Sequence, residues 1–258
     1  QRLRWNDISD VCGNREQPVR MNACPTASAF IFDLDGTLVD SAPDIAASVA
    51  HALQTIGFEA PSLARIRSFI GNGADRLIHR SLTDDINGTA DDVLFNRAAK
   101  LFFRHYEDNV CCRSIVYASV TETLTALRNR GHLLACVTNK PTRFTDPLLK
   151  QLGLDQFFPI TLSGDSLEAK KPAPDQLLFV AEHFKIAPQQ CVMIGDTITD
   201  IVAAENANMS SIYVSYGYGD ISDIDLRHPL AVVDSLDQII DLLNAVPDAR
   251  KGSLVLPA

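Results

Sequence analysis

Short apolar runs alternate with longer amphipathic segments along most of this chain. A short apolar run bounded by polar or turn-forming residues predicts a buried strand, and its alternation with amphipathic segments predicts a parallel sheet flanked by helices. The expected fold class is therefore α/β. The predicted strands cover residues 29–34, 133–138, 160–164, 191–196, 211–215 and, more weakly, 230–233.

Three of the amphipathic segments between the strands carry a helix-stop signal. The segments at 119–131, 143–153 and 199–208 end at Gly131, Gly153 and Asn208. Glycine and asparagine tolerate the left-handed backbone conformation that closes many helices. We therefore expect each segment to be a helix that ends near these residues.

The interval between the first two predicted strands does not show this alternation of strands and helices. It reads as helix throughout, most clearly at 44–57, 62–71 and 96–107, with no convincing strand. We expect a helical cap over 41–112, inserted into a core formed by 28–40 and 113–245. The remaining ends, a loose leader over 1–27 and a tail over 246–258, show no periodic pattern.

Composition narrows the possible partners. The 258 residues suffice for an α/β core with an insertion. With 23 basic and 32 acidic residues, the net charge of −9 gives no general attraction to nucleic acid or to an anionic membrane. No apolar run approaches the ~20 residues that span a bilayer, and the 6 cysteines form no CxxC pair. A soluble, cytoplasmic protein with free thiols is expected, whereas its oligomeric state is not indicated.

Two acids interrupt the first apolar run, AFIFDLDGT, at Asp33 and Asp35. Successive side chains of an extended chain alternate between faces, so these two carboxylates should project to the same side. Gly36 permits a sharp turn directly afterwards, at the carboxyl end of a strand, where open α/β sheets bind their ligands. Two carboxylates beside an apolar strand repel one another unless a cation offsets them, which favours a functional site.

Three further motifs follow predicted strands. VTNKP offers the hydroxyl of Thr138 and the amide of Asn139 as donors to phosphate oxygens, GDSLEAKKPAPD offers Lys171, and GDTITD offers Asp196 and Asp200. Each motif alone has an ordinary structural explanation: a helix cap, a pair of surface lysines, or a turn. Together with the paired acids, and in this order, they indicate one site.

The four motifs resemble those of the haloacid dehalogenase superfamily of aspartate-dependent phosphohydrolases, over roughly residues 29–240. The phrases FIGNGADRL, VTNKPTRF, GDSLEAKKPAPD and YGYG are similar to those of the bacterial phosphoglycolate phosphatases. The resemblance implies a Rossmann-like core with a helical cap. Two turns depart from the family pattern: YASV at 117–120 replaces a Tyr-Pro-Gly turn, and Asn208 stands where a glycine is usual.

This resemblance implies a Mg²⁺-dependent hydrolase of phosphomonoesters. Asp33 is the expected nucleophile, which as a carboxylate needs no base to activate it. The carboxylates of Asp33 and Asp196, with the backbone carbonyl of Asp35, are the expected Mg²⁺ ligands. Asp35 would protonate the leaving group and then activate water to hydrolyse the aspartyl-phosphate on Asp33.

The other motif residues are expected to support this reaction. Thr138 and Asn139 would bind the phosphoryl oxygens, and Lys171 would add a fixed positive charge. Asp200 would orient Asp196 or Lys171 from behind, although an ordinary role at a helix start explains it equally well.

The cap should select the substrate, because the core motifs recognise only the phosphoryl group. The loop with Gly71, Asn72 and Gly73, together with Arg76, is the candidate to bind a second anionic group, although a helix stop followed by a cap also explains it. 2-Phosphoglycolate is the expected substrate. The alternatives are a sugar or amino-sugar phosphate, a phosphomutase reaction, or a non-catalytic phospho-acceptor or binding domain.

Overall fold

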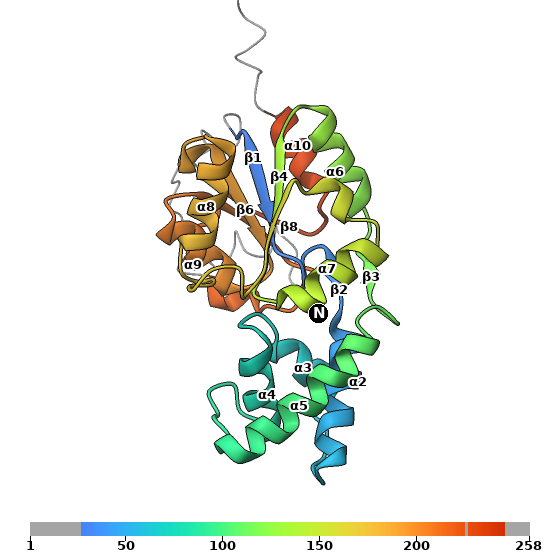
Figure 1. The fold of residues 1–258 in the computed structure, drawn as a ribbon. Coiled ribbons are helices and arrows are strands. Elements are labelled where there is room, and N and C mark those ends of the chain that lie inside the picture. Colours follow the sequence, from blue (N-terminus) through green and yellow to red (C-terminus); the bar gives the residue numbers. More distant parts are fainter. Residues whose placement is uncertain (1–26, 225–226, 246–258) are drawn as a thin grey trace, which may run out of the picture.

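The structure is a computed structural model that describes residues 27–224 and 227–245. Its main sheet has 6 strands in the order β5-β4-β1-β6-β7-β8, and every neighbouring pair is parallel. This sheet confirms the predicted α/β class (Figure 1). The strands are β1 (Ala29–Phe32), β4 (Leu133–Val137), β5 (Ile160–Leu162), β6 (Cys191–Gly195), β7 (Ser210–Val214) and β8 (Ala231–Val233).

All six predicted strands are present, but the first and the third are each two residues shorter than predicted. β1 ends at Phe32, so Asp33 and Asp35 follow the strand instead of lying within it. The backbone N–H of Asp33 still donates to the Ile194 carbonyl at 2.9 Å, and the chain turns immediately afterwards. Strand alternation therefore does not extend to Asp35, which corrects the predicted reason for the two acids sharing one side.

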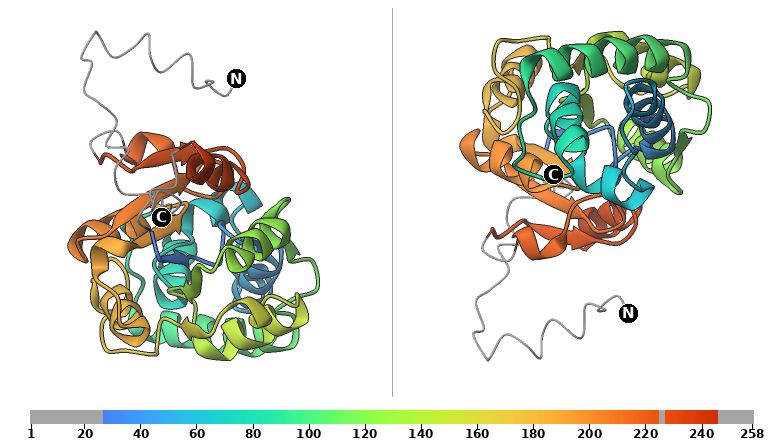
Figure 2. Two further views of the ribbon diagram at one scale, coloured as in Figure 1. Left: turned by 90° about the horizontal axis from the view of Figure 1, so that it is seen from above. Right: turned by 90° about the horizontal axis from the view of Figure 1, so that it is seen from below.

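The sheet is buried on both faces by helices. In β1, Phe30 and Phe32 pack into one apolar cluster, whereas Ala29 and Ile31 pack into the other. One face is covered by α6 (Val120–Asn129), α7 (Thr142–Gln151) and α10 (Gln238–Asn244), and the other by α8 (Asp175–Phe184) and α9 (Ile198–Asn206) (Figures 1 and 2). Short 3₁₀ turns η2 (Asp155–Phe157), η3 (Pro188–Gln190) and η4 (Ile221–Ile224) complete the core.

The predicted helix stops adopt the left-handed conformation. Gly131, Gly153 and Asn208 have φ values of +82°, +67° and +55°, and each lies two residues beyond its helix. Asparagine tolerates this region better than most side chains, so Asn208 replaces glycine there with little strain. In the YASV turn, Ser119 has φ +62°, and its hydroxyl pairs with that of Ser235 at 3.0 Å.

Four helices lie beyond the carboxyl ends of the strands, on the side where the chain leaves β1 (Figure 1; Figure 2, right). Two short antiparallel strands, β2 (Val39–Asp40) and β3 (Ile115–Val116), lie on the two connections to these helices. Both were missed, because two residues are too few to show an alternating pattern. The helices are α2 (Ala42–Thr55), α3 (Leu63–Phe69), α4 (Ala74–Thr83) and α5 (Asp92–Asp108).

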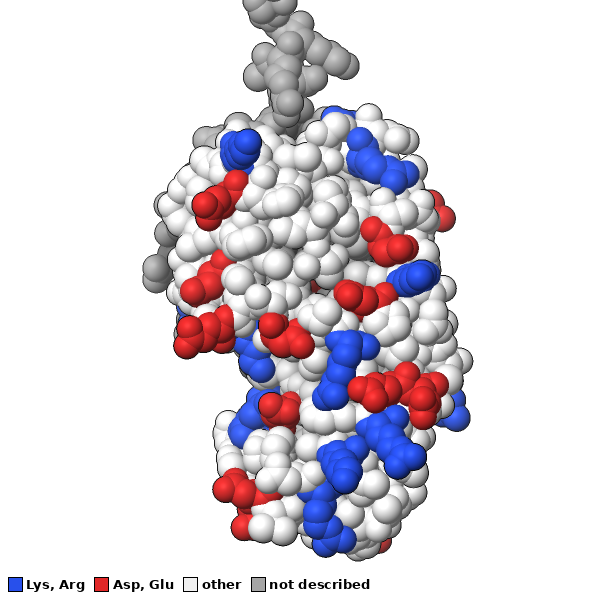
Figure 3. Space-filling view, in the orientation of Figure 1, with Lys and Arg blue, Asp and Glu red and all other residues white. Residues whose placement is uncertain are grey.

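We refer to α2–α5 and their loops as the cap, although the predicted boundaries of 41–112 for the cap and of 28–40 and 113–245 for the core stay predictions. The predicted leader, up to residue 26, and the predicted tail from residue 246 lie outside the described residues. On the face drawn in Figure 3, acidic and basic side chains are interspersed over both halves of the molecule. Among the described helices, none has the length and apolar character needed to traverse a bilayer.

Candidate active site

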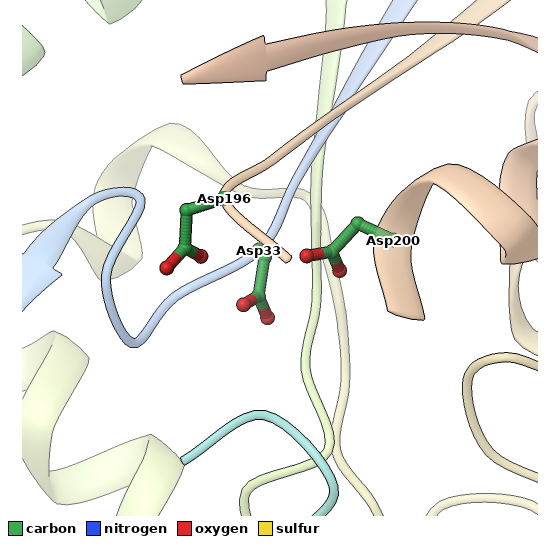
Figure 4. A group of neighbouring side chains, drawn as sticks. All are labelled: Asp33, Asp196 and Asp200. Atoms are coloured by element: carbon green, nitrogen blue, oxygen red, sulfur yellow. The ribbon is translucent and has the colours of Figure 1, made fainter. Parts of the chain in front are cut away.

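Three buried carboxylates meet at the carboxyl end of the sheet. Asp33 follows β1, Asp196 follows β6, and Asp200 lies in the first turn of α9. They are 5%, 0% and 1% exposed, and one oxygen from each lies within 4.8 Å of the others. Figure 4 shows the three side chains converging from these elements. Such a set of oxygen atoms could hold a metal ion.

Lys171 neutralises part of this charge. Its Nζ donates to Asp33 Oδ1 at 2.8 Å and to Asp200 Oδ1 at 2.7 Å. Burial opposes the charge of Lys171, but the two carboxylates outweigh burial and raise the pKa of Lys171 above its ordinary value. Burial also raises the pKa of Asp33 from 3.8 to about 6, because the attraction of Lys171 only partly offsets burial and the repulsion of Asp200.

Asp196 has no cationic partner among the described side chains. Its oxygens accept hydrogen bonds from the Thr37 hydroxyl at 3.0 Å and from the Tyr218 backbone N–H at 2.7 Å. Burial, and then the charges of Asp33 and Asp200, raise the pKa of Asp196 well above its ordinary value. A buried carboxylate paired only with neutral donors is costly when ionised, so the donor set fits a divalent cation between Asp33 and Asp196.

Asp35 belongs to a second group of side chains. Lys140 Nζ donates to its two oxygens at 3.0 and 3.1 Å, and the Ser41 hydroxyl donates to Oδ1. The same Nζ donates to the Tyr106 hydroxyl at 2.7 Å, and Tyr106 belongs to cap helix α5. Each acid of the pair after β1 therefore has its own lysine, Lys171 for Asp33 and Lys140 for Asp35.

The predicted phosphate donors lie at the end of β4. Thr138 is buried, and its hydroxyl accepts from the Lys140 backbone N–H at 3.2 Å. Asn139 Nδ2 donates to the backbone carbonyls of Gly71 at 2.9 Å and Lys171 at 2.8 Å. The side-chain nitrogen of Asn139 therefore holds the cap loop against the core. Of these two predicted donors, Thr138 is the one whose side-chain proton is left for a ligand.

The predicted cap loop lies against the core. Asn72 Nδ2 donates to the Thr199 hydroxyl at 3.0 Å. A Cβ on Gly73 would lie 2.8 Å from Lys170 Nζ and 3.2 Å from the Asn139 carbonyl oxygen, so the loop passes close to the core at this residue.

Arg76, in contrast, points away from the site. Its guanidinium donates to the carbonyls of Ile86 at 2.9 Å and Gly88 at 2.8 Å, which holds the loop between α4 and α5. The expectation that Arg76 receives a substrate group is not supported by this placement. A second anionic group would need another cation.

A pocket lies between the acids and the cap, with a cavity volume of about 40 Å³. Because one water molecule needs ~10–15 Å³ by this measure, the cavity holds only a few water molecules. Its wall is mainly apolar on the cap side and polar on the core side. The lining residues are Asp33, Asp35, Ile45, Ile70, Gly71, Gly73, Ala74, Leu77, Phe102, Tyr106, Thr138, Asn139, Lys140, Pro141 and Phe144.

Gly36 lets the backbone pass close to Asp196. Its φ is +91°, and a Cβ there would lie 2.2 Å from Asp196 Oδ2. No side chain fits this position without moving the carboxylate. The turn expected from the sequence is therefore also a close approach to the candidate metal site.

We expect Gly36→Ala to cost about 2–5 kcal/mol of unfolding free energy, the sum of backbone strain and overpacking. Gly57 provides the matched control, because its φ of +89° is nearly the same but nothing lies within 4 Å of its Cβ position. Gly57→Ala should lower the free energy of unfolding only by the backbone strain, about 1–2 kcal/mol. Chemical denaturation of both variants gives the comparison, and equal losses would contradict the close packing at Asp196.

A family model described as haloacid dehalogenase-like hydrolase matches residues 30–214, more than half of the chain. The chain belongs to this family. The phosphoglycolate phosphatase of Nitrosococcus oceani is 42% identical to this haloacid dehalogenase-like hydrolase over 215 residues, which cover 83% of this chain and 96% of the relative. A phosphoglycolate phosphatase of Vibrio vulnificus is 41% identical over 214 residues, covering 82% and 94%.

A solved structure supports the same fold for this haloacid dehalogenase-like hydrolase. A predicted phosphoglycolate phosphatase from Haemophilus somnus superposes with a TM-score of 0.79 at 34% identity, over 84% of this chain and 98% of that one. The predicted Rossmann-like fold and superfamily are thus confirmed.

Four residues of this hydrolase's site were not predicted from the sequence: Thr37, Tyr106, Lys140 and Tyr218. Thr37, Lys140 and Tyr218 stand inside phrases that the family resemblance had already singled out, DLDGT, VTNKP and YGYG. Tyr106 carried no such signal, because it lies on an amphipathic cap helix where an aromatic residue normally serves packing.

Proposed function

We propose that this chain is a Mg²⁺-dependent phosphatase that hydrolyses 2-phosphoglycolate to glycolate and phosphate. The observation that carries the proposal is that Asp33 and Asp35 line one cavity while Lys171, Asp196 and Asp200 are buried around Asp33. A nucleophile and a proton donor that reach the same small space are what phosphomonoester cleavage requires. The names of the relatives support the same reaction.

Asp33 attacks phosphorus in the first step. One of its oxygens is held by Lys171, which leaves the other for the new bond to phosphorus. The bond between phosphorus and the ester oxygen breaks, and the phosphoryl group moves to Asp33. Thr138, which lines the cavity, donates its hydroxyl proton to a phosphoryl oxygen and keeps the group aligned.

Asp35 transfers the protons. It gives a proton to the departing ester oxygen in the first step, and as a carboxylate it then accepts a proton from the water that attacks the phosphorylated Asp33. Both transfers occur at the same phosphorus, which explains why the second acid follows the first so closely in the chain.

The Asp33 and Asp196 carboxylates, with the Asp35 backbone carbonyl, would hold the Mg²⁺ ion. When bound, the ion supplies positive charge that offsets the repulsion between Asp33 and a phosphate dianion. Asp200 keeps Lys171 in place and orients the start of α9 by accepting from the Thr197 backbone N–H at 3.1 Å. Its role is therefore to position Lys171.

Mg²⁺ affinity should fall with decreasing pH. Burial raises the pKa of Asp33 from 3.8 to about 6, so a proton competes with the ion below about pH 6. We expect binding to weaken by up to about tenfold per pH unit below this value for each competing proton. Calorimetric titrations at about pH 5 and about pH 7.5 test this, and equal affinities would contradict Asp33 as a ligand.

The substrate assignment rests on the names of the relatives and on the apolar wall of the cavity. A sugar ring needs several hydroxyl partners, whereas Ile45, Leu77 and Phe102 offer none. The kcat/KM ratio should therefore favour 2-phosphoglycolate over hexose and amino-sugar phosphates by at least about tenfold, or about 1.4 kcal/mol. A panel of phosphomonoesters with Mg²⁺ and with excess EDTA provides the measurement. A sugar phosphate preferred by that factor would overturn the substrate but not the phosphatase chemistry.

A further inference from the structure

Lys140 is the only lysine or arginine among the residues that line the cavity. Its side chain is 3% exposed, and its Nζ contacts Asp35 and Tyr106. The backbone of Lys140 is also held firmly, because its carbonyl accepts from the Gly164 N–H at 2.9 Å and the Thr145 hydroxyl at 3.2 Å. The cation thus occupies a defined position beside the proton donor.

The other cations near the site do not line the cavity. Lys171 is shared by Asp33 and Asp200, and Arg76 binds backbone carbonyls of the loop after α4. Lys170 approaches the cap loop at Gly73, but it is exposed and lies outside the lining. The wall opposite the acids consists of apolar side chains such as Ile45, Leu77 and Phe102. A second anionic group that enters this cavity loses its hydration and gains no other cationic side chain of the lining than Lys140.

In 2-phosphoglycolate a single methylene carbon joins the ester oxygen to a carboxylate. A cation that binds this carboxylate must therefore lie next to the oxygen that leaves. Asp35 must approach the same oxygen to protonate it, and Lys140 already contacts Asp35. The position that the carboxylate needs is the one that the Asp35 carboxylate occupies beside Lys140 in this structure.

We propose that Lys140 receives the carboxylate of the substrate and thereby releases Asp35 to turn toward the leaving oxygen; this rests on the proposed function. The exchange replaces the Asp35 carboxylate on Nζ by the carboxylate of the substrate, so Lys140 stays paired throughout. Asp35 takes up a proton from water as it leaves Lys140 and delivers that proton to the departing ester oxygen. Tyr106 keeps its hydrogen bond to Nζ from the cap helix, which ties the position of the cation to the presence of the cap. Esters without a carboxylate leave Asp35 bound to Lys140 and react more slowly.

This exchange is tested by measuring two substrates with two proteins, the wild type and Lys140→Met. Ethyl phosphate matches 2-phosphoglycolate in chain length and replaces its carboxylate by a methyl group. We expect Lys140→Met to lower kcat/KM for 2-phosphoglycolate at least about tenfold more than for ethyl phosphate. With ethyl phosphate the substitution frees Asp35 and removes no contact to the substrate, so the larger loss should fall on 2-phosphoglycolate.

Two further variants keep the result interpretable. Lys150→Met removes an exposed lysine from the end of α7 and should leave kcat/KM unchanged for both substrates. Lys140→Arg retains a cation and should preserve a preference for 2-phosphoglycolate even if Lys140→Met fails to fold. Loss of that preference in a folded Lys140→Arg protein would count against recognition by charge.

The outcomes separate this inference from the proposed function. Equal losses on both substrates in Lys140→Met would show that Lys140 serves Asp35 alone, and would overturn the inference while the phosphatase assignment stands. A wild-type protein that hydrolyses ethyl phosphate as well as 2-phosphoglycolate would overturn it too. A wild-type protein that hydrolyses no phosphomonoester in the presence of Mg²⁺ would overturn the proposed function, and the inference with it.

Discussion

Asp33→Asn should reduce kcat by about a thousandfold or more, the order of loss that follows removal of a covalent nucleophile. An amide has almost the shape of a carboxylate but does not attack phosphorus. Lys171 keeps its bond to Asp200 in this variant, so the site should retain its packing. Steady-state hydrolysis of 2-phosphoglycolate, together with thermal unfolding of the same sample, tests this expectation.

Asp155→Asn is the matched control for this experiment. Asp155 is an exposed aspartate in η2, at the other end of α7 from the site, and its loss should leave kcat unchanged. Acid-quenched wild-type protein should carry a phosphoryl group that Asp33→Asn lacks, as mass spectrometry would detect. An Asp33→Asn protein that keeps more than a few per cent of wild-type activity would remove Asp33 as the nucleophile.

The sheet could be predicted from the sequence because its inner strands β4, β1, β6 and β7 are buried on both faces. Such strands appear as continuous apolar runs, and all six were recognised. The end of β1 was placed two residues too late, because Leu34 is again apolar after Asp33 although the strand has already ended at Phe32. The pairing of β2 with β3 depends on contacts between distant segments, and two residues carry no period that would reveal it.

The core part of the site could also be predicted from the sequence, since the strand order of a parallel sheet brings the loops after β1, β4 and β6 together. The orientation of side chains on the cap could not be predicted. Arg76 stands one turn after the cap loop and looked available, yet it binds carbonyls of the next loop. Tyr106 gave no sign of a role in the site, yet its hydroxyl accepts from Lys140 Nζ. Both outcomes depend on how the cap docks, which no local pattern determines.

Asp35→Asn should lower kcat by about 10²–10⁴-fold on 2-phosphoglycolate and other alkyl phosphates, the range expected for loss of a general acid and base. p-Nitrophenyl phosphate should respond differently, because nitrophenolate leaves without a proton. The first step then stays fast, whereas hydrolysis of the phosphorylated Asp33 still lacks its base. Nitrophenolate should appear in a burst that approaches the enzyme concentration, followed by slow turnover.

Rapid-mixing measurements of nitrophenolate release test this separation of the two steps. The structure supplies a reason to expect a clean result: Asp35 and Asp33 contact different lysines, so the Lys171 bond that aligns the nucleophile survives when Asp35 is replaced. The freed Lys140 keeps the Tyr106 hydroxyl as a partner, which limits the cost of the substitution to stability. Equal losses on nitrophenyl and alkyl phosphates without a burst would instead mean that Asp35 only shapes the site.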